Sequence, residues 1–360
     1  MTTAQTPDQL NFWHAAPIGR AAFKVEPEDF IVKELFQPPI TGTGEHLYLQ
    51  VEKRNQNSVW VAAQLAQAAG IEVGSVGFCG LKDRRAVTQQ WYSLHLPGRE
   101  LNIDALAHDD YRILQSGRGS AKLRRGDHSG NHFVITLRDI DCSPAEVEAR
   151  IETLCQNGFA NYFGLQRFGR NGNNLAEVER LVQAGKLVGD RGRQRAQARR
   201  QSRGGARKKV ANHNGLLLSA ARSWLFNQVL HARLNNSEQS LQIDDDGPLW
   251  GRGRALAEPL LAEFEAGCLA PWKHWCEALE HSGLQQQRRP LIGVAQSFEH
   301  NWLDETTLRL SFELGAGEFA TSLLRELLVL HQLDPASRAD RECCAIVANS
   351  KNSSQCGDLV

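Results

Sequence analysis

The sequence contains no long hydrophobic segment, no cysteine motif and no net charge. No apolar run approaches the roughly eighteen residues that a membrane-spanning helix requires. The opening segment, MTTAQTPDQLNFW, lacks both the basic stretch and the apolar core of a secretory signal. The eight cysteines form no Cys-x-x-Cys pair and no Cys/His cluster at zinc spacing, so no metal site is indicated. We therefore expect a cytoplasmic protein with reduced thiols.

The charges balance, at 41 basic and 41 acidic side chains, so the chain is not uniformly basic in the way that many nucleic-acid-binding proteins are. Basic residues are nevertheless concentrated in three places. These are residues 186–209, residues 118–125, and the group Lys82, Arg84 and Arg85. Three basic clusters on a neutral chain indicate one cationic face.

A strand followed by a helix is expected at three places along the chain. Residues 46–53 alternate apolar and polar side chains, which predicts a strand, and Ser58 and Gly70 are expected to begin and end the following helix. The segment HFVITLRDI predicts a second strand, and Ser143 with Glu146 predicts a capping box at the next helix. A third strand precedes GAGEF, which leads into the helix ATSLLRELLVL. The chain therefore mixes strands and helices throughout.

The segment VGFCGLKDRRAVTQQW carries the clearest chemical signal. Its glycines allow a tight loop that presents the carboxylate of Asp83. The cations Lys82, Arg84 and Arg85 stabilise that negative charge and attract a phosphate backbone. Spacing alone favours an ordinary surface loop with solvated charges.

The same segment resembles a family motif, G-x-K-D-x-x-A-x-T-x-Q, that is typical of TruD-type tRNA pseudouridine synthases. Its positions are occupied by Gly80, Lys82, Asp83, Ala86, Thr88 and Gln90. Further segments resemble this family in the same order, from about Phe23 to Leu330. They are FKVEPEDFIVKE, GTGEHLYLQVEKRNQNS, GNHF, NYFGLQRFGRNGNN, LLSAARSWLFNQVL and LGAGEFATSLLREL.

The resemblance implies an enzyme that isomerises a uridine of tRNA, at position 13 of the D arm, to pseudouridine. It implies that Asp83 is the catalytic residue, that tRNA is the partner and that no cofactor is required. One carboxylate can act as a nucleophile at C1′ or C6, or as a base that opens a glycal route, and the sequence does not choose among these. We expect a monomer.

The resemblance also assigns substrate-binding residues. Because enzymes that modify bases commonly flip the nucleotide into an apolar pocket, Phe133 and Phe319 are assigned to the uridine pocket, and Asn131 is placed to bond either Asp83 or the base. Without the resemblance, both phenylalanines read as ordinary core residues. Glu318 stands where serine is common in the family, which places an extra negative charge beside Phe319.

Four further side chains are candidates. Lys24 and Lys82 are expected either to pair with Asp83 or to contact phosphate, although each also fits a surface lysine. Gln166 and Arg167 are weaker candidates for RNA contact, in a segment whose aromatic residues are expected to pack at a domain junction. Those aromatic residues are Tyr162, Phe163 and Phe168.

The expected fold class is α+β, with a catalytic domain of mixed, largely antiparallel sheet and flanking helices, plus an inserted α+β domain. The predicted boundaries assign residues 1–157 and 304–335 to the catalytic domain, residues 158–303 to the insertion, and residues 336–360 to a peripheral tail. The basic stretch 186–209 within the insertion is either an arm that becomes ordered on tRNA or a solubilising linker.

Two other functions remain open on the sequence. A glycosidase would use Asp83 as nucleophile but usually needs a second carboxylate. Local spacing ties no second acid to Asp83, although Glu26, Glu28 and Asp29 could approach it in three dimensions. A non-catalytic RNA-binding module would keep the scaffold, but binding alone gives no reason to face an anionic ligand with a carboxylate.

Overall fold

The computed structural model describes residues 9–187, 213–236 and 241–332, and it divides into two compact units. The sheet unit comprises residues 18–147, 296–316 and 328–332. The helical unit comprises residues 9–17, most of 148–295, and 317–327. Residues 148–157 and 317–327, expected in the catalytic domain, thus lie in the helical unit, whereas 296–303 lie in the sheet unit. The insertion itself stays a prediction, and most of the basic stretch and the whole tail fall outside the described residues.

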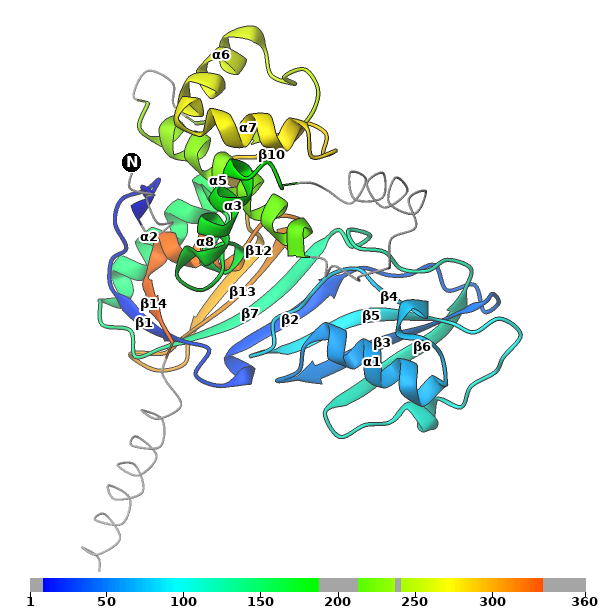
Figure 1. Cartoon of the computed structure of the whole chain (residues 1–360). Helices are drawn as coiled ribbons and strands as arrows, with labels where there is room; N and C mark the ends of the chain where they lie inside the picture. The colour runs from blue at the N-terminus through cyan, green and yellow to red at the C-terminus, as the bar shows by residue number, and fades with distance from the viewer. Residues whose placement is uncertain (1–8, 188–212, 237–240, 333–360) are drawn as a thin grey trace, which may run out of the picture. The chain divides into compact units, whose positions relative to one another are not determined.

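A ten-stranded sheet forms the sheet unit (Figure 1). Its main path runs in the order β12 (Gln296–Trp302), β13 (Leu308–Gly315), β7 (Gly130–Arg138), β2 (Phe30–Leu35), β5 (Val87–His95), β3 (His46–Arg54), β6 (Tyr111–Gly119). Three short strands pair beside this path: β1 (Arg20–Phe23), β4 (Val76–Phe78) and β14 (Val329–His331). Only the β1–β14 and β2–β5 pairings are parallel among the described strands. The expected mixed, largely antiparallel sheet is therefore confirmed.

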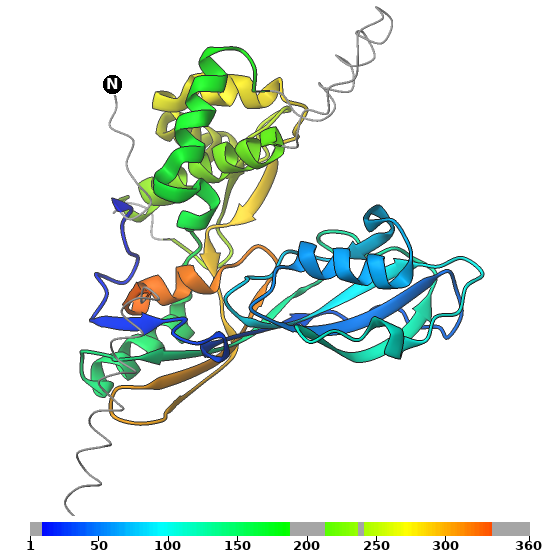
Figure 2. The same cartoon turned by 60° about the horizontal axis from the view of Figure 1, so that its bottom comes forward.

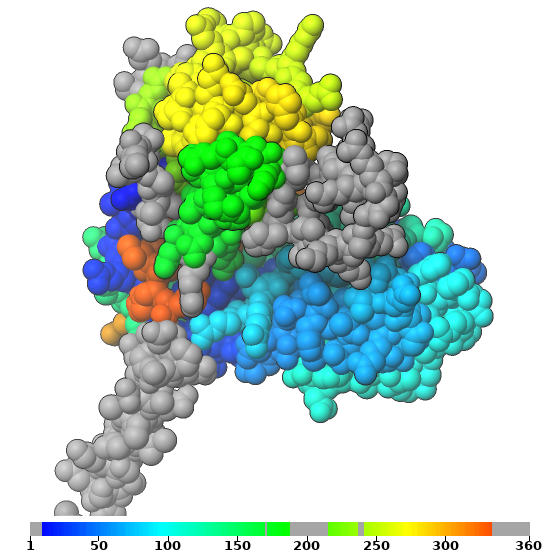
Figure 3. Space-filling view, viewed as in Figure 1, coloured from blue at the N-terminus to red at the C-terminus, as the bar shows by residue number. Residues whose placement is uncertain are grey.

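Helix α1 (Ser58–Ala69) lies on one face of this sheet, as Figures 1 and 2 both show. Its apolar stripe packs against alternate side chains of β3 and β5 in one buried cluster. Its outer face contributes to the surface visible in Figure 3. On this helix Val59 is 51% exposed. The helix ends at Gly70 in the left-handed conformation, with φ 63°, as expected. The expected cap is wrong, because Asn57 caps the helix and Ser58 is its first, buried residue.

The other two strand–helix predictions are confirmed with one correction. Strand β7 leads to α2 (Pro144–Asn157), where Ser143 and Glu146 exchange the bonds of a capping box. Strand β13 leads to α8 (Ala320–Leu327). The last helix is shorter than predicted, because residues after Leu327 turn into β14 and pair with β1. Backbone pairing with a distant strand outweighs the local helix propensity of these leucines.

The helical unit is built around α5 (His213–Leu234), which the apolar run LLLSAARSWLFNQVLHARL predicts. Trp224 and Phe226 of α5 are buried at the centre of its core. Tyr162, Phe163 and Phe168 belong to the same core, while their role at a junction stays a prediction. The other elements of this unit are α3 (Asn173–Gln183), α6 (Pro259–Cys268), α7 (Lys273–Glu280), and the strand pairs β8 (Phe159–Ala160) with β11 (Ile292–Gly293) and β9 (Asp246–Leu249) with β10 (Gln287–Pro290).

Short 3-10 helices connect these elements. They are η2 (Pro27–Asp29), η3 (Val73–Ser75), η4 (Ile103–Leu106), η5 (Leu165–Phe168), η6 (Arg170–Gly172) and η7 (Ala270–Trp272). Among the described helices, none is long and apolar enough to cross a membrane. The described part of the chain also holds no group of three His, Cys, Asp or Glu side chains placed to bind a metal ion.

Candidate active site

Asp83 lies in the loop between β4 and β5, in the sheet unit. Each of the neighbouring strands β2, β5 and β3 has a row of buried side chains on one face, and in each row one side chain is polar. These polar residues are Glu34, which follows Phe30 and Val32, Gln90, which precedes Tyr92 and Leu94, and Lys53, which follows Leu49 and Val51. Because side chains alternate across a strand, these three polar residues point into the interior with the apolar ones. They supply the groups that hold the loop.

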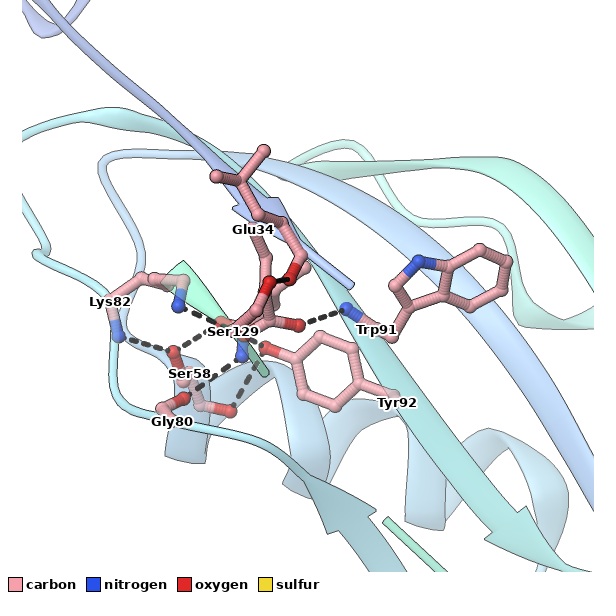
Figure 4. A network of polar contacts seen from close by, with 9 residues as sticks. Glu34, Ser58, Gly80, Lys82, Trp91, Tyr92 and Ser129 are labelled. Carbon is pink, nitrogen blue, oxygen red and sulfur yellow. Dashed lines mark hydrogen bonds and ion pairs between the residues drawn. The ribbon is translucent and has the colours of Figure 1, made fainter. Parts of the chain in front are cut away.

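A network of hydrogen bonds fixes the loop (Figure 4). The backbone N–H of Lys82 donates to Ser58 Oγ over 3.0 Å, and that hydroxyl donates to the side-chain carbonyl of Gln90. The Gln90 amide in turn donates to the carbonyl of Gly80 over 3.0 Å. Tyr92 also donates to the Gln90 side-chain carbonyl. Since buried hydrogen-bond networks restrict the conformation of the backbone that they satisfy, the position of Asp83 is well defined.

The side chain of Lys82 pairs with Glu34, and no ion pair or hydrogen bond joins it to Asp83 in the described structure. Its ammonium lies 2.9 Å from Glu34, and the two side chains are 5% and 1% exposed. The second oxygen of Glu34 accepts the backbone N–H of Trp91 over 3.1 Å. The structure therefore gives Lys82 a structural partner other than Asp83, and its contact with phosphate stays a prediction.

Lys24 is the cation beside Asp83. Its ammonium lies 3.3 Å from the carboxylate, with side chains 4% and 37% exposed respectively. The ammonium also lies over the ring of Phe30, 3.8 Å from its centroid. Burial lowers the pKa of Lys24, and Asp83 acts in the opposite direction. Asp83 therefore offers a partly exposed carboxylate whose charge is matched by one buried ammonium.

The backbone of Lys24 is in the left-handed region, with φ 55°. This conformation costs a residue other than glycine about 1–2 kcal/mol. The ion pair and the cation–π contact hold the ammonium of this same residue at Asp83. Such strain is typical of residues whose position serves a functional site.

Lys53 supports Asp83 from the main-chain side. Its ammonium donates to the carbonyl of Asp83 over 2.8 Å and to the carbonyl of Gln56 over 2.5 Å. The residue is only 1% exposed. Burial lowers the pKa of Lys53 to about 8, against the opposing effect of Asp83.

This low pKa predicts a pH-dependent stability. As pH rises through 8 the folded protein releases the Lys53 proton, whereas the unfolded chain keeps it until near the ordinary value of 10.5. The free energy of unfolding of the wild type should therefore rise by about 3 kcal/mol relative to Lys53→Met between these limits. Urea denaturation of both proteins at pH 7 and pH 10 measures this difference, and an equal difference at the two pH values would contradict it.

Phe133 is buried, at 7% exposure, in a row of aromatic rings. Its centroid lies 6.0 Å from Phe30, over which Lys24 sits, and 5.6 Å from Phe312. Phe312 stacks in turn on Phe298 at 5.3 Å. The structure thus connects Phe133 to the Lys24–Asp83 pair through Phe30, and it places most of the ring in the core.

Asn131 lies on β7, opposite Glu34 of β2 in the register. Its side-chain oxygen is buried and has no hydrogen-bond partner among the described residues. A buried carbonyl oxygen without a donor costs about 1–3 kcal/mol. An N–H group of a bound molecule would satisfy it. The expected bond from Asn131 to Asp83 is not formed in the described structure.

The remaining predicted residues lie in the helical unit. Phe319, just before α8, packs against Phe163 with centroids 5.5 Å apart. Arg167 donates to Ser219 over 3.1 Å, and Gln166 is exposed. Glu318 accepts the backbone N–H of Val294 over 3.2 Å.

Sequence reasoning assigned no role in holding the Asp83 loop to four residues, although Gln90 is a position of the motif and Ser58 was expected to begin a helix: Glu34, Lys53, Ser58 and Gln90. The sequence does mark Glu34, Lys53 and Gln90, because each is a polar residue in a strand position where the alternation would otherwise place an apolar one. Ser58 carried no such signal, since a serine at the start of a helix is normally a cap.

The three acids considered as a second carboxylate are engaged elsewhere. Asp29 binds Arg138 through both oxygens, at distances of 2.7–3.1 Å. Glu28 pairs with Arg54 at 2.6 Å, and Glu26 takes part in the capping box of η2. In the described structure none of them forms an ion pair or hydrogen bond with Asp83, whose carboxylate pairs with Lys24.

Comparisons with known proteins identify relatives over most of the chain. The profile of the family described as tRNA pseudouridine synthase D (TruD) matches residues 11–189. A protein named tRNA pseudouridine synthase D from Cellvibrio japonicus is 41% identical over 322 residues, covering 86% of this chain and 90% of the relative. Its namesake from Aeromonas hydrophila is 37% identical, covering 92% and 97%. The crystal structure of a TruD-named protein from Methanosarcina mazei shares the fold, with a TM-score of 0.62 at 21% identity over 89% of this chain and 96% of that one.

Proposed function

Because the chain belongs to the tRNA pseudouridine synthase D (TruD) family, we propose that it isomerises a uridine of tRNA to pseudouridine, with Asp83 as the reacting carboxylate. By resemblance the target is position 13 of the D arm. The proposal includes a monomeric enzyme that needs no cofactor, with the helical unit as an insertion in a catalytic domain. The observation that carries the proposal is the partly exposed Asp83 carboxylate held 3.3 Å from the buried ammonium of Lys24.

The reaction requires few groups. The N1–C1′ bond breaks, the base turns, a C5–C1′ bond forms, the C5 proton is lost and N1 gains a proton. An ionised Asp83 serves either as the nucleophile at C1′ or C6, or as the base that removes the sugar proton. Lys24 balances the carboxylate charge before and after it reacts. The unpartnered oxygen of Asn131 suits the N3–H of a uracil ring, which is a donor.

The two alternative functions, a glycosidase and a non-catalytic RNA-binding module, fit the geometry around Asp83 less well than a pseudouridine synthase does. A glycosidase usually pairs two carboxylates, and the acids considered for this role, Glu26, Glu28 and Asp29, are bound to other groups. A binding module gives no reason for a strained lysine to hold an exposed carboxylate toward an anionic ligand. Catalysis by Asp83 explains both features.

Tritium release from C5-labelled uridine in unmodified tRNA tests the proposal. Each turnover replaces one C5–H bond, so the wild type should release tritium up to one equivalent per tRNA. Mapping of pseudouridine in the product should then find it at position 13. Release of uracil instead of tritium would support the glycosidase, and neither product from folded protein with a mixed tRNA pool would support the binding module.

A further inference from the structure

Residues 24–29 form a loop, the Lys24 loop, between β1 and β2. The last residue of β1, Phe23, lies opposite Leu137 of β7. The first residue of β2, Phe30, lies opposite Ile135, so a single residue of β7 separates the two partners. Within the described sheet the loop itself takes part in no strand pairing. Because the ladder does not fix its backbone, its conformation depends on other contacts.

The carboxylate of Asp29, at the end of the Lys24 loop, is the main anchor. Its side chain is 2% exposed and accepts hydrogen bonds from the guanidinium of Arg138 on β7, over 2.7–3.1 Å. The same carboxylate accepts the backbone N–H of Glu26 over 3.0 Å, and the Glu26 carbonyl accepts the N–H of Asp29 over 3.1 Å. One buried carboxylate therefore closes the loop and joins it to β7.

The anchored loop presents Lys24 in a conformation that a lysine rarely adopts. Its φ of 55° lies in the left-handed region, which is unfavourable for a residue with a Cβ atom. Its ammonium lies 3.3 Å from Asp83 and 3.8 Å from the ring centroid of Phe30. Phe30 directly follows Asp29 in the chain, so the anchor fixes both the strained backbone and the ring beneath the ammonium.

Stability alone does not account for the Arg138–Asp29 pair. Hydrophobic residues of similar volume generally stabilise an interior as well as a buried ion pair does. What the pair adds is orientation, because the planar fork of an arginine fits a carboxylate in one arrangement. Orientation is what the Lys24 loop needs, since a shift of its backbone would move the ammonium away from Asp83.

We infer that Arg138 is a positioning residue for the proposed reaction: by binding Asp29, it holds the Lys24 loop in the conformation that places the ammonium at Asp83. Arg138 acts through the loop, because in the described structure it forms no ion pair or hydrogen bond with Lys24 or Asp83. The inference deepens the proposed function and rests on it for the reaction that Lys24 and Asp83 serve.

Lysine labelling tests the inference without relying on turnover. The probe is acetic anhydride, with acetylation of each lysine followed by mass spectrometry. In the wild type Lys24 should react slowly, because its side chain is 4% exposed, and Arg138→Gln should accelerate its reaction by about tenfold or more. Lys53, which is 1% exposed, should stay protected in both proteins, and the exposed Lys33 checks that the reagent dose is equal.

Tritium release tests whether Arg138 acts through Lys24. Arg138→Gln should lower kcat by about ten- to a hundredfold and leave the KM for tRNA near its wild-type value, because the variant displaces a group at the reacting centre. Added to Lys24→Met, it should cause little further loss, since the residue that it positions is already removed. Arg138→Lys should recover part of kcat, because lysine keeps the charge but not the fork.

The matched control is Arg233→Gln, which breaks a short, buried ion pair with Asp245 in the helical unit. This variant should keep kcat near the wild-type value and should leave Lys24 protected from acetylation. Circular dichroism checks that every variant is folded.

Three results would overturn the inference. The first is a folded Arg138→Gln protein in which Lys24 is as protected as in the wild type. The second is a double variant in which the losses of Arg138→Gln and Lys24→Met multiply. The third is faster labelling of Lys53 together with Lys24, which would mean that Arg138 supports the whole sheet unit. Absence of tritium release by the wild type would instead count against the proposed function, while the labelling would still show whether Arg138 positions Lys24.

Discussion

Asp83→Asn is expected to reduce tritium release from C5-labelled tRNA by about 10⁴-fold or more, the scale seen when a reacting side chain is removed. The substitution keeps the size and most of the polarity of the side chain, but an amide is a poor nucleophile and a poor base. The loop anchors should survive, because they are made by the backbone of residues 80–83 and by Lys82, not by the Asp83 side chain.

The affinity for tRNA separates a loss of catalysis in Asp83→Asn from a folding defect. Removing a negative charge that faces a polyanion should leave the Kd for tRNA unchanged or lower it. The matched control is Asp110→Asn, which makes the same chemical change at a 46%-exposed aspartate of the sheet unit and should keep full activity. Retention of a tenth of the wild-type rate by Asp83→Asn would remove Asp83 from the chemical step.

The second large effect is expected from the buried Lys82–Glu34 pair. Each single variant, Lys82→Met or Glu34→Gln, leaves one charge in the interior without its counter-charge, which costs about 3–5 kcal/mol of unfolding free energy. The double variant removes both charges and keeps, in glutamine, an acceptor for the Trp91 N–H. Its loss should therefore be smaller than the sum of the two single losses by at least about 2 kcal/mol.

Urea denaturation of the four proteins completes this double-mutant cycle. The control pair is Arg180 and Glu177, an ion pair on the surface of α3 whose coupling should be much weaker, because solvent screens exposed charges. Additive losses for Lys82→Met and Glu34→Gln would mean that the two side chains do not interact, which contradicts the network in Figure 4. The double variant should also keep more activity than either single variant, since its loop is less disturbed.

The elements that the sequence predicts correctly are those with a long, regular period. Strands β3, β7 and β13 and helix α5 follow directly from the spacing of their apolar residues. The Ser143–Glu146 box and the left-handed Gly70 follow from local stereochemistry. The end of α8 does not, because the residues after Leu327 pair with β1, whose sequence lies about three hundred residues earlier.

In the candidate site, too, some features depend on neighbouring residues in the sequence and others on residues that only the fold brings together. The motif around Asp83 is contiguous, so the amino-acid sequence alone points to it. The choice between Lys24 and Lys82 as the partner of Asp83 is not local, since Lys82 is adjacent in sequence yet bonds to Glu34 on a neighbouring strand. A residue next to a loop aspartate has its side chain directed by the strands around it, not by its neighbour.

The sequence by itself therefore determined the family, the reacting residue proposed for it, and the strands and helices with clear periodicity, because each depends on residues that are close together in the chain. Only the tertiary structure decided which lysine faces Asp83, which buried polar groups hold its loop, and which arginine binds the loop that carries Lys24. These facts depend on strand register and helix packing. Such contacts join residues far apart in sequence, and the energies that select them arise only when the chain is folded.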